Sequence, residues 1–153
     1  MLKKVLVIDD SALIRRKYTL VLKRYGCGII GAVNGKEGFE CLTDNSDLDL
    51  ILLGIHMPVM DGIDFLKMVR CSHPHGHIPI VLLATDGQEE EVMRGISLGA
   101  QGYVRKNDPP DTLHELLERL SLRASSSLFG DMSVLPEKQN NEASRYAGYR
   151  LMM

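Results

Sequence analysis

Two adjacent aspartates, Asp9 and Asp10, and a distant lysine, Lys106, are the side chains whose types best suit chemistry. The aspartates follow the apolar run VLVI, and two like charges at the end of a buried strand are costly unless a cation joins them. Lys106 could supply that charge. So could Mg²⁺, which accepts one or two carboxylates and completes its octahedron with water and phosphate oxygens. An aspartate pair alone is also common at a turn that ends a strand, so the position of Lys106 decides between these interpretations.

Alternating strand and helix patterns must position these groups. Five short apolar runs alternate with five helical patterns, which predicts a parallel sheet with helices on both faces. Ser11 is predicted to cap the first helix, and Asn34 with Glu37 to form a capping box on the second. The predicted strands cover residues 3–8, 28–33, 48–53, 78–83 and 102–105.

In open parallel sheets the working crevice lies beyond the carboxyl ends of the strands, where the strand order reverses. This rule gathers one set of residues at a single edge of the predicted sheet. The set is Asp9 and Asp10 after the first strand, Gly54 after the third, Ala84 and Thr85 after the fourth, and Lys106 after the fifth.

Four motifs in order resemble the receiver domain of two-component response regulators: VLVIDDS, DLILLGIHMPVMDG, PIVLLAT and GAQGYVRK. The resemblance covers about residues 3–122 and implies a five-stranded parallel sheet flanked by five helices, flavodoxin-like in strand order. It further implies that Asp9 and Asp10 match the family's Mg²⁺-binding acids. Lys106 matches the lysine that contacts the phosphoryl group, and Tyr103 matches the aromatic residue that changes rotamer on activation.

Two positions depart from the family pattern. Where the family has its phosphorylated aspartate this chain has Gly54, which offers neither a nucleophile nor a metal ligand, so Mg²⁺ binding is expected to be weakened. Where the family has a serine or threonine that binds the phosphoryl group, this chain has Ala84. The next residue is Thr85, and successive strand side chains face opposite ways, so Thr85 should point elsewhere unless a bulge shifts the register.

These observations predict a stand-alone receiver-like signalling module that acts by protein–protein interaction without aspartyl phosphorylation. By resemblance its partner is a histidine kinase or a downstream signalling protein that binds residues 86–122. The alternative is a conventional receiver in which glycine, natural or engineered, has replaced the acceptor. An enzyme on the same fold is disfavoured, and no organic cofactor is expected, because the acids of IDDSALIRR would repel a flavin phosphate.

Composition limits the remaining function classes. A formal net charge of -2 gives no reason to expect nucleic acid as a partner, and no run approaches the roughly 20 apolar residues of a membrane span. Three widely spaced cysteines fit a reducing compartment, and a cytoplasmic protein is expected.

Residues 1–123 are predicted to form the receiver-like domain and 124–153 a flexible polar tail. Its end could form a short helix that docks on the domain or on a second copy, in a homodimer.

Histidines offer two further sites, both of which have a simpler explanation. His73, His75 and His77 near Cys71 could bind Zn²⁺ or Ni²⁺, but Pro74 and Gly76 favour a solvated loop. His56 lies near the acceptor position and could accept phosphate, although a loop histidine that faces solvent is the favoured interpretation.

Overall fold

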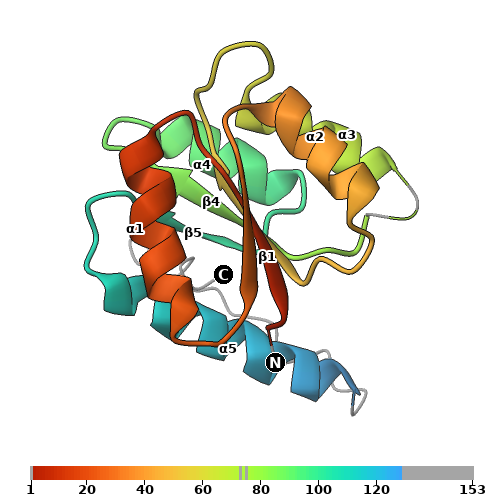
Figure 1. Ribbon diagram of the computed structural model, residues 1–153, viewed down its shortest axis with the longest axis vertical. Helices are drawn as coiled ribbons and strands as arrows, with labels where there is room; N and C mark the ends of the chain where they lie inside the picture. Colours follow the sequence, from red (N-terminus) through yellow and green to blue (C-terminus); the bar gives the residue numbers. More distant parts are fainter. Residues whose placement is uncertain (1, 73, 75, 129–153) are drawn as a thin grey trace.

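The structure is a computed structural model that describes residues 2–72, 74 and 76–128. Strands and helices alternate along this part of the chain (Figure 1). The strands are β1 (Lys4–Ile8), β2 (Gly28–Ala32), β3 (Leu50–Gly54), β4 (Ile80–Ala84) and β5 (Gly102–Arg105). The helices are α1 (Ala12–Lys23), α2 (Gly35–Asp44), α3 (Gly62–Cys71), α4 (Glu89–Ser97) and α5 (Pro110–Leu128).

All strand pairs are parallel, and the five strands form one sheet in the order β2-β1-β3-β4-β5. This is the flavodoxin-like order, which confirms the predicted fold class. The chain moves outward from β1 to β2 in one direction and from β3 to β5 in the other. The strand order therefore reverses between β1 and β3, where Ile8 pairs with Leu53.

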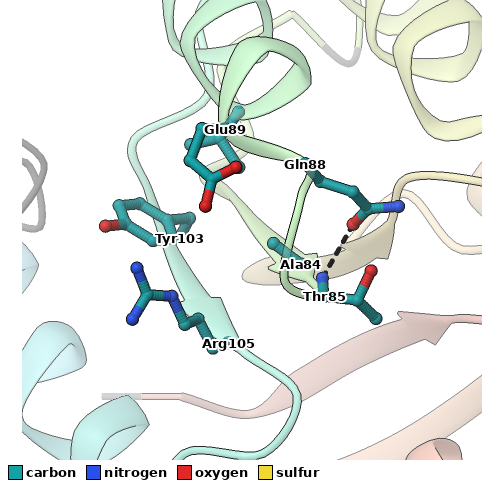
Figure 2. Close-up of a pocket in the computed structure, with 7 residues that line it drawn as sticks. Ala84, Thr85, Gln88, Glu89, Tyr103 and Arg105 are labelled. Carbon is teal, nitrogen blue, oxygen red and sulfur yellow. Dashed lines mark hydrogen bonds between the residues drawn. The ribbon is translucent and has the colours of Figure 1, made fainter.

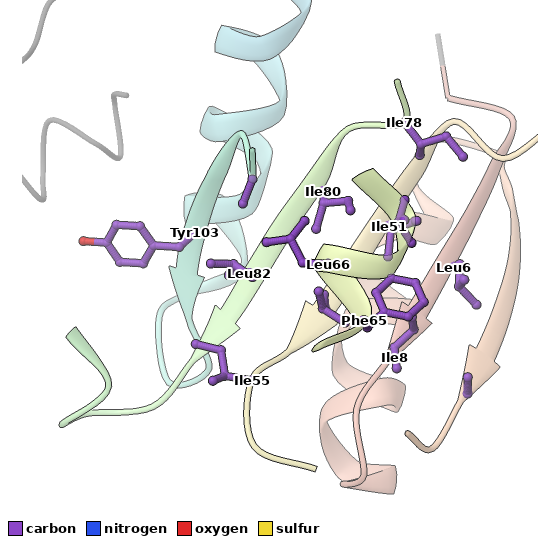
Figure 3. Packing of buried hydrophobic residues seen from close by; sticks show 14 of the residues in the cluster. Leu6, Ile8, Ile51, Ile55, Phe65, Leu66, Ile78, Ile80, Leu82 and Tyr103 are labelled. Atoms are coloured by element: carbon purple, nitrogen blue, oxygen red, sulfur yellow. The ribbon is translucent and has the colours of Figure 1, made fainter. Parts of the chain in front are cut away.

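Alternate residues of the strands build two separate cores, one on each face of the sheet. On one face Leu6, Ile51 and Leu82 pack with residues of α2 and α3, including Phe65 and Leu66 (Figure 3). On the other face Val7, Leu52 and Leu83 pack with residues of α1 and α5. Because both faces are buried, β3 and β4 are apolar along their whole length and not alternating, as expected for a central parallel strand.

β3 and β4 differ most from the predicted strand boundaries, whereas β1 begins and β2 ends within one residue of the prediction. β3 and β4 begin two residues later than predicted, because Leu48 and Ile78 are buried without pairing in the sheet. Both strands also end one residue later, so Gly54 and Ala84 belong to the strands and do not follow them. The sequence prediction placed the starts of these strands where buried apolar residues begin, whereas the observed starts are defined by hydrogen-bond pairing with the neighbouring strand.

The predicted helix caps are present. Ser11 Oγ accepts a hydrogen bond from the Ile14 amide at 3.2 Å, and Asn34 Oδ1 accepts one from the Glu37 amide at 2.8 Å. Glu37 completes its capping box with the amide of Val33, one residue before the predicted partner, at 2.9 Å.

Helix α5 continues to Leu128 and so includes residues 124–128, which the sequence assigned to the tail. The rest of the predicted tail, 129–153, lies outside the described residues, as do His73 and His75. Among the described residues, no helix has both the length and the apolar character needed to cross a membrane.

Candidate functional site at the carboxyl ends of the strands

Asp9 and Lys106 meet at the carboxyl edge of the sheet. The Lys106 ammonium lies 2.8 Å from Asp9 Oδ2, and the aspartate side chain is fully buried while the lysine is 16% exposed. Lys106 follows β5 and its amide donates to the Ala84 carbonyl at 2.7 Å, which anchors it beside β4. The predicted cation therefore joins the first of the two acids, and the burial of Asp9 depends on it.

The other polar atoms of Asp9 are bonded to α1 and β2. Oδ1 accepts a hydrogen bond from the Ser11 amide at 2.9 Å, and the Asp9 carbonyl accepts one from the Arg15 guanidinium at 2.7 Å. The Asp9 amide donates to the Ala32 carbonyl at 3.0 Å. Oδ2 has no hydrogen-bond partner among the described residues, so its contact with Lys106 is an ion pair without hydrogen-bond geometry.

Gly54 stands beside this carboxylate at the end of β3. A Cβ atom on Gly54 would lie 2.7 Å from Asp9 Oδ2, 3.2 Å from its Cγ and 3.3 Å from the Ile8 carbonyl oxygen. Real Cβ atoms essentially never approach another atom as closely as 2.7 Å, so Asp9 Oδ2 occupies the space in which a side chain at position 54 would begin. Glycine is the residue that permits the observed position of Asp9.

Asp10 and Thr85 lie apart from this pair. Asp10 is exposed, whereas Asp9 is buried, because neighbouring residues at the strand end face opposite ways. Ala84 is buried and Thr85 is exposed, in line with the predicted alternation of neighbouring side chains. The Thr85 amide is bonded to Gln88 Oε1 at 2.7 Å.

The loop that carries Lys106 is held by α1. Lys17 Nζ donates to the carbonyl oxygens of Lys106 at 2.6 Å and Asp108 at 2.8 Å. The buried Tyr18 hydroxyl lies 3.4 Å from the Arg105 carbonyl oxygen. Burial raises the Tyr18 pKa well above its usual value, and the negative charges of Asp108 and Asp9 raise it further.

The loop between β3 and α3 packs closely under the site. Gly62 donates its amide to the Ile55 carbonyl at 2.7 Å, and a Cβ there would lie 2.0 Å from the Gly54 carbonyl oxygen. Val59, which is 76% exposed, has a φ of 72°, a conformation that is strained for a β-branched residue. His56, also in this loop, faces solvent and lies 3.4 Å from Glu91 of α4.

Tyr103 lies on the adjoining surface and not in the strand-end crevice. Its side chain is 6% exposed, between Glu89 and Arg105, with the hydroxyl directed away from Ala84 (Figure 2). Ala84, Gln88, Val92, Tyr103 and Arg105 are among the residues that line a shallow hollow there. Tyr103 thus connects the edge of the crevice to the face of α4 and β5.

The arrangement does not suit Mg²⁺ as it stands. Asp9 is held by Lys106 and the Ser11 amide, Asp10 is exposed, and Gly54 supplies no ligand. The described residues contain no group of three or more His, Cys, Asp or Glu side chains that could hold a metal ion. His77 and Cys71 are exposed, and the rest of the predicted histidine site lies outside the described residues.

Sequence reasoning missed Lys17 and Arg15 as parts of this site. Both donate hydrogen bonds to backbone carbonyl oxygens. The positions of these oxygens depend on how the loops fold, so they cannot be read from the residue types. Helix α1 carries three other cations, Arg15, Arg16 and Lys23, so a lysine at position 17 looks like an ordinary surface residue in the sequence.

Known proteins resemble the chain over nearly all of this fold. The family model of the response regulator receiver domain matches residues 5–118. The chemotaxis protein CheY1 of Helicobacter pylori is 35% identical over 116 residues, which are 75% of this chain and 94% of that protein. A chemotaxis protein CheY homolog of Campylobacter jejuni is 34% identical over 75% of this chain and 89% of its own length.

The structure of this chain is also similar to solved structures of response regulators. The chemotaxis response regulator CheY4 of Vibrio cholerae superposes with a TM-score of 0.70 at 32% identity, over 78% of this chain and 99% of that one. A response regulator structure from Chloroflexus aurantiacus gives a TM-score of 0.72 at 26% identity, over 80% of this chain and all of that one. With this fold, these motifs and this family match, the chain belongs to the response regulator receiver domains of two-component signalling.

Proposed function

We propose that this receiver domain signals by binding a protein partner and is not phosphorylated on aspartate. The observation that carries the proposal is the 2.7 Å separation between Asp9 Oδ2 and the Cβ position of Gly54. If Gly54 stands at the acceptor position, the nucleophile is missing and a neighbouring carboxylate fills its space. The charge of Lys106, which would meet a phosphoryl group, is already neutralised by Asp9.

The partner surface that we propose is the face formed by α4, β5 and α5, within residues 86–122. It carries the hollow beside Tyr103 and several exposed charged side chains. A histidine kinase or a downstream signalling protein is the proposed partner, and a second copy of the chain could also use this face. We propose a cytoplasmic, non-enzymatic module, in keeping with the signalling proteins that it resembles.

A second candidate is a conventional receiver inactivated by glycine at the acceptor position. The ion pair of Asp9 and Lys106 favours it, because both charged groups that the chemistry would need remain in contact. Under this candidate the Gly54→Asp variant recovers phosphorylation once the Asp9 side chain swings away from position 54.

The test is incubation with Mg²⁺ and acetyl phosphate, followed by intact-mass spectrometry. The native chain, Gly54→Asp and Gly54→Asn are compared, since asparagine matches aspartate in size but lacks the nucleophilic carboxylate. We expect no phosphoryl adduct on the native chain or on Gly54→Asn.

An adduct on Gly54→Asp alone would mean that the crevice survives and lacks only its nucleophile. An inert Gly54→Asp variant would exclude the second candidate. A Mg²⁺-dependent adduct on the native chain would show that another residue accepts phosphate and would refute the proposal.

A further inference from the structure

Two shallow hollows lie on the surface of α4 and β5 and share Tyr103 and Arg105. The first extends toward α4 and reaches Gln88 and Val92, and the second extends toward α5 and reaches Asp108 and Thr112. In Figure 2 Glu89 and Arg105 stand on either side of the Tyr103 ring at the first hollow. We call this surface, from Asp86 to Met93 and from Tyr103 to Arg105, the α4–β5 face.

The α4–β5 face carries a local excess of negative charge. Asp86, Glu89, Glu90 and Glu91 fall within six consecutive residues. Of these, only Glu91 has an ion pair among the described residues, with His56. Asp86, Glu89 and Glu90 are exposed. The positive end of the α4 dipole favours Glu89 and Glu90 in the first turn, but it does not neutralise their exposed carboxylates or that of Asp86, which precedes the helix.

An exposed apolar side chain adjoins these acids. Met93 is 42% exposed and follows Glu89 by four residues and Glu90 by three, so the three side chains share one side of α4. Val92, which directly precedes Met93 in the chain, is buried and lines the first hollow. The face therefore combines acidic groups with apolar and aromatic ones, which suits a cationic segment with aromatic or aliphatic side chains.

The chain itself contains such a segment. Residues 143–153, ASRYAGYRLMM, have two arginines, two tyrosines, a leucine and two methionines, and no acidic side chain. Tyrosine, methionine and arginine are the residue types enriched where protein surfaces bind one another. Arg145 and Arg150 complement the unpaired carboxylates, and Tyr146 and Tyr149 complement the hollow.

The connection is long enough for this segment to return to the face. Helix α5, of 19 residues, is about 29 Å long and carries the chain away from the carboxyl edge of the sheet. Residues 129–142, if fully extended, span up to about 46 Å. A flexible tether of this length would give an effective concentration of about 1 mM, so a contact with a Kd below about 1 mM would be formed more than half of the time.

We propose that residues 143–153 dock onto the α4–β5 face of the same chain, with Arg145 and Arg150 beside Glu89 and Glu90. The docked segment would compete with any protein that uses this face. The inference goes beyond the proposed function, and its test needs no partner, so either can fail without the other.

The test compares amide ¹H–¹⁵N spectra of the full chain with those of the double variant Arg145→Glu/Arg150→Glu. The amides of Thr85, Gln88, Tyr103 and Arg105 are expected to shift in the variant. The matched control is Arg16→Glu/Lys23→Glu, which makes the same change in net charge at exposed positions of α1. The control is expected to leave the Tyr103 and Arg105 amides in place.

A charge swap makes the test specific for the proposed pairing. Adding Glu89→Arg/Glu90→Arg to the tail variant is expected to return the Tyr103 and Arg105 amides toward their native positions. If the tail variant leaves these amides unmoved, the segment does not dock there. If they shift on dilution of the native protein, the occupant is a second copy, which also overturns docking within one chain.

Discussion

The ammonium group of Lys17 lies between two carbonyl oxygens of the loop after β5, 2.6 Å from that of Lys106 and 2.8 Å from that of Asp108. One lysine of α1 thus fixes the backbone of another lysine, whose own side chain is paired with the buried Asp9. Lys17 is therefore a positioning residue: it holds the loop from which the cation reaches the crevice.

Replacement of Lys17 by methionine is expected to lower the free energy of unfolding by about 1–2 kcal/mol, since two hydrogen bonds from a charged donor are lost. Urea unfolding measures the change. The matched control is Arg16→Met, an exposed neighbour on the same helix, which should change stability by less than about 0.5 kcal/mol. Equal effects of the two substitutions would show that the Lys17 bonds contribute nothing specific.

Gly54→Ala is expected to destabilise the fold by about 2 kcal/mol, because the new methyl group would push Asp9 Oδ2 from its contact with Lys106. Gly28→Ala is the control, since a Cβ at that strand position has the Lys3 carbonyl oxygen, 3.8 Å away, as its nearest neighbour.

A double-mutant cycle with Asp9→Ala isolates the contact between positions 9 and 54. With the carboxylate gone, the cost of Gly54→Ala should fall by about half or more. An unchanged cost would mean that the Ile8 carbonyl, and not Asp9, limits the space at position 54.

Val59→Asn is expected to raise the free energy of unfolding by about 1 kcal/mol. Asparagine tolerates the left-handed conformation at φ 72°, whereas valine is strained in it. Val33→Asn serves as the control, because Val33 is also an exposed loop valine, at 38%, but has a negative φ. Thermal unfolding compares the pair, and a loss of stability in Val59→Asn would show that the valine side chain itself stabilises the loop.

Alkaline unfolding should depend on Tyr18. Its pKa is raised in the folded chain, so the unfolded state releases the phenolic proton first as the pH rises. The stability linked to this group is therefore complete below the unfolded pKa of about 10 and is lost as the pH rises toward the folded value. Urea unfolding at about pH 8 and about pH 10.5 should show a smaller loss for Tyr18→Phe than for the native chain. An identical loss would mean that other groups govern the alkaline limit.

The sequence predicted the elements and their order well because both faces of the sheet are buried. Continuous apolar runs mark β3 and β4, and the residues that cap α1 and α2 are the predicted ones. The starts of β3 and β4 were two residues early, since a pattern of apolar residues reports burial and not hydrogen-bond pairing.

The site was only partly predictable. The strand ends brought Asp9, Gly54 and Lys106 together as expected, because the carboxyl ends of parallel strands share one edge. The pattern could not tell Asp9 from Asp10, although one is buried and the other exposed. Nor could it show that Asp9 occupies the side-chain space of position 54, since this depends on the direction of one carboxylate in the folded chain.

The charge on Lys106 is balanced within the polypeptide, by Asp9. In a domain that is switched by a covalent phosphoryl group, the lifetime of that bond sets how long the signal lasts. Under the proposed function the crevice forms no phosphoryl bond whose hydrolysis could end the signal. The duration of the signal would then be set by the lifetime of the complex with the partner protein, and the concentration of that partner would start and stop it.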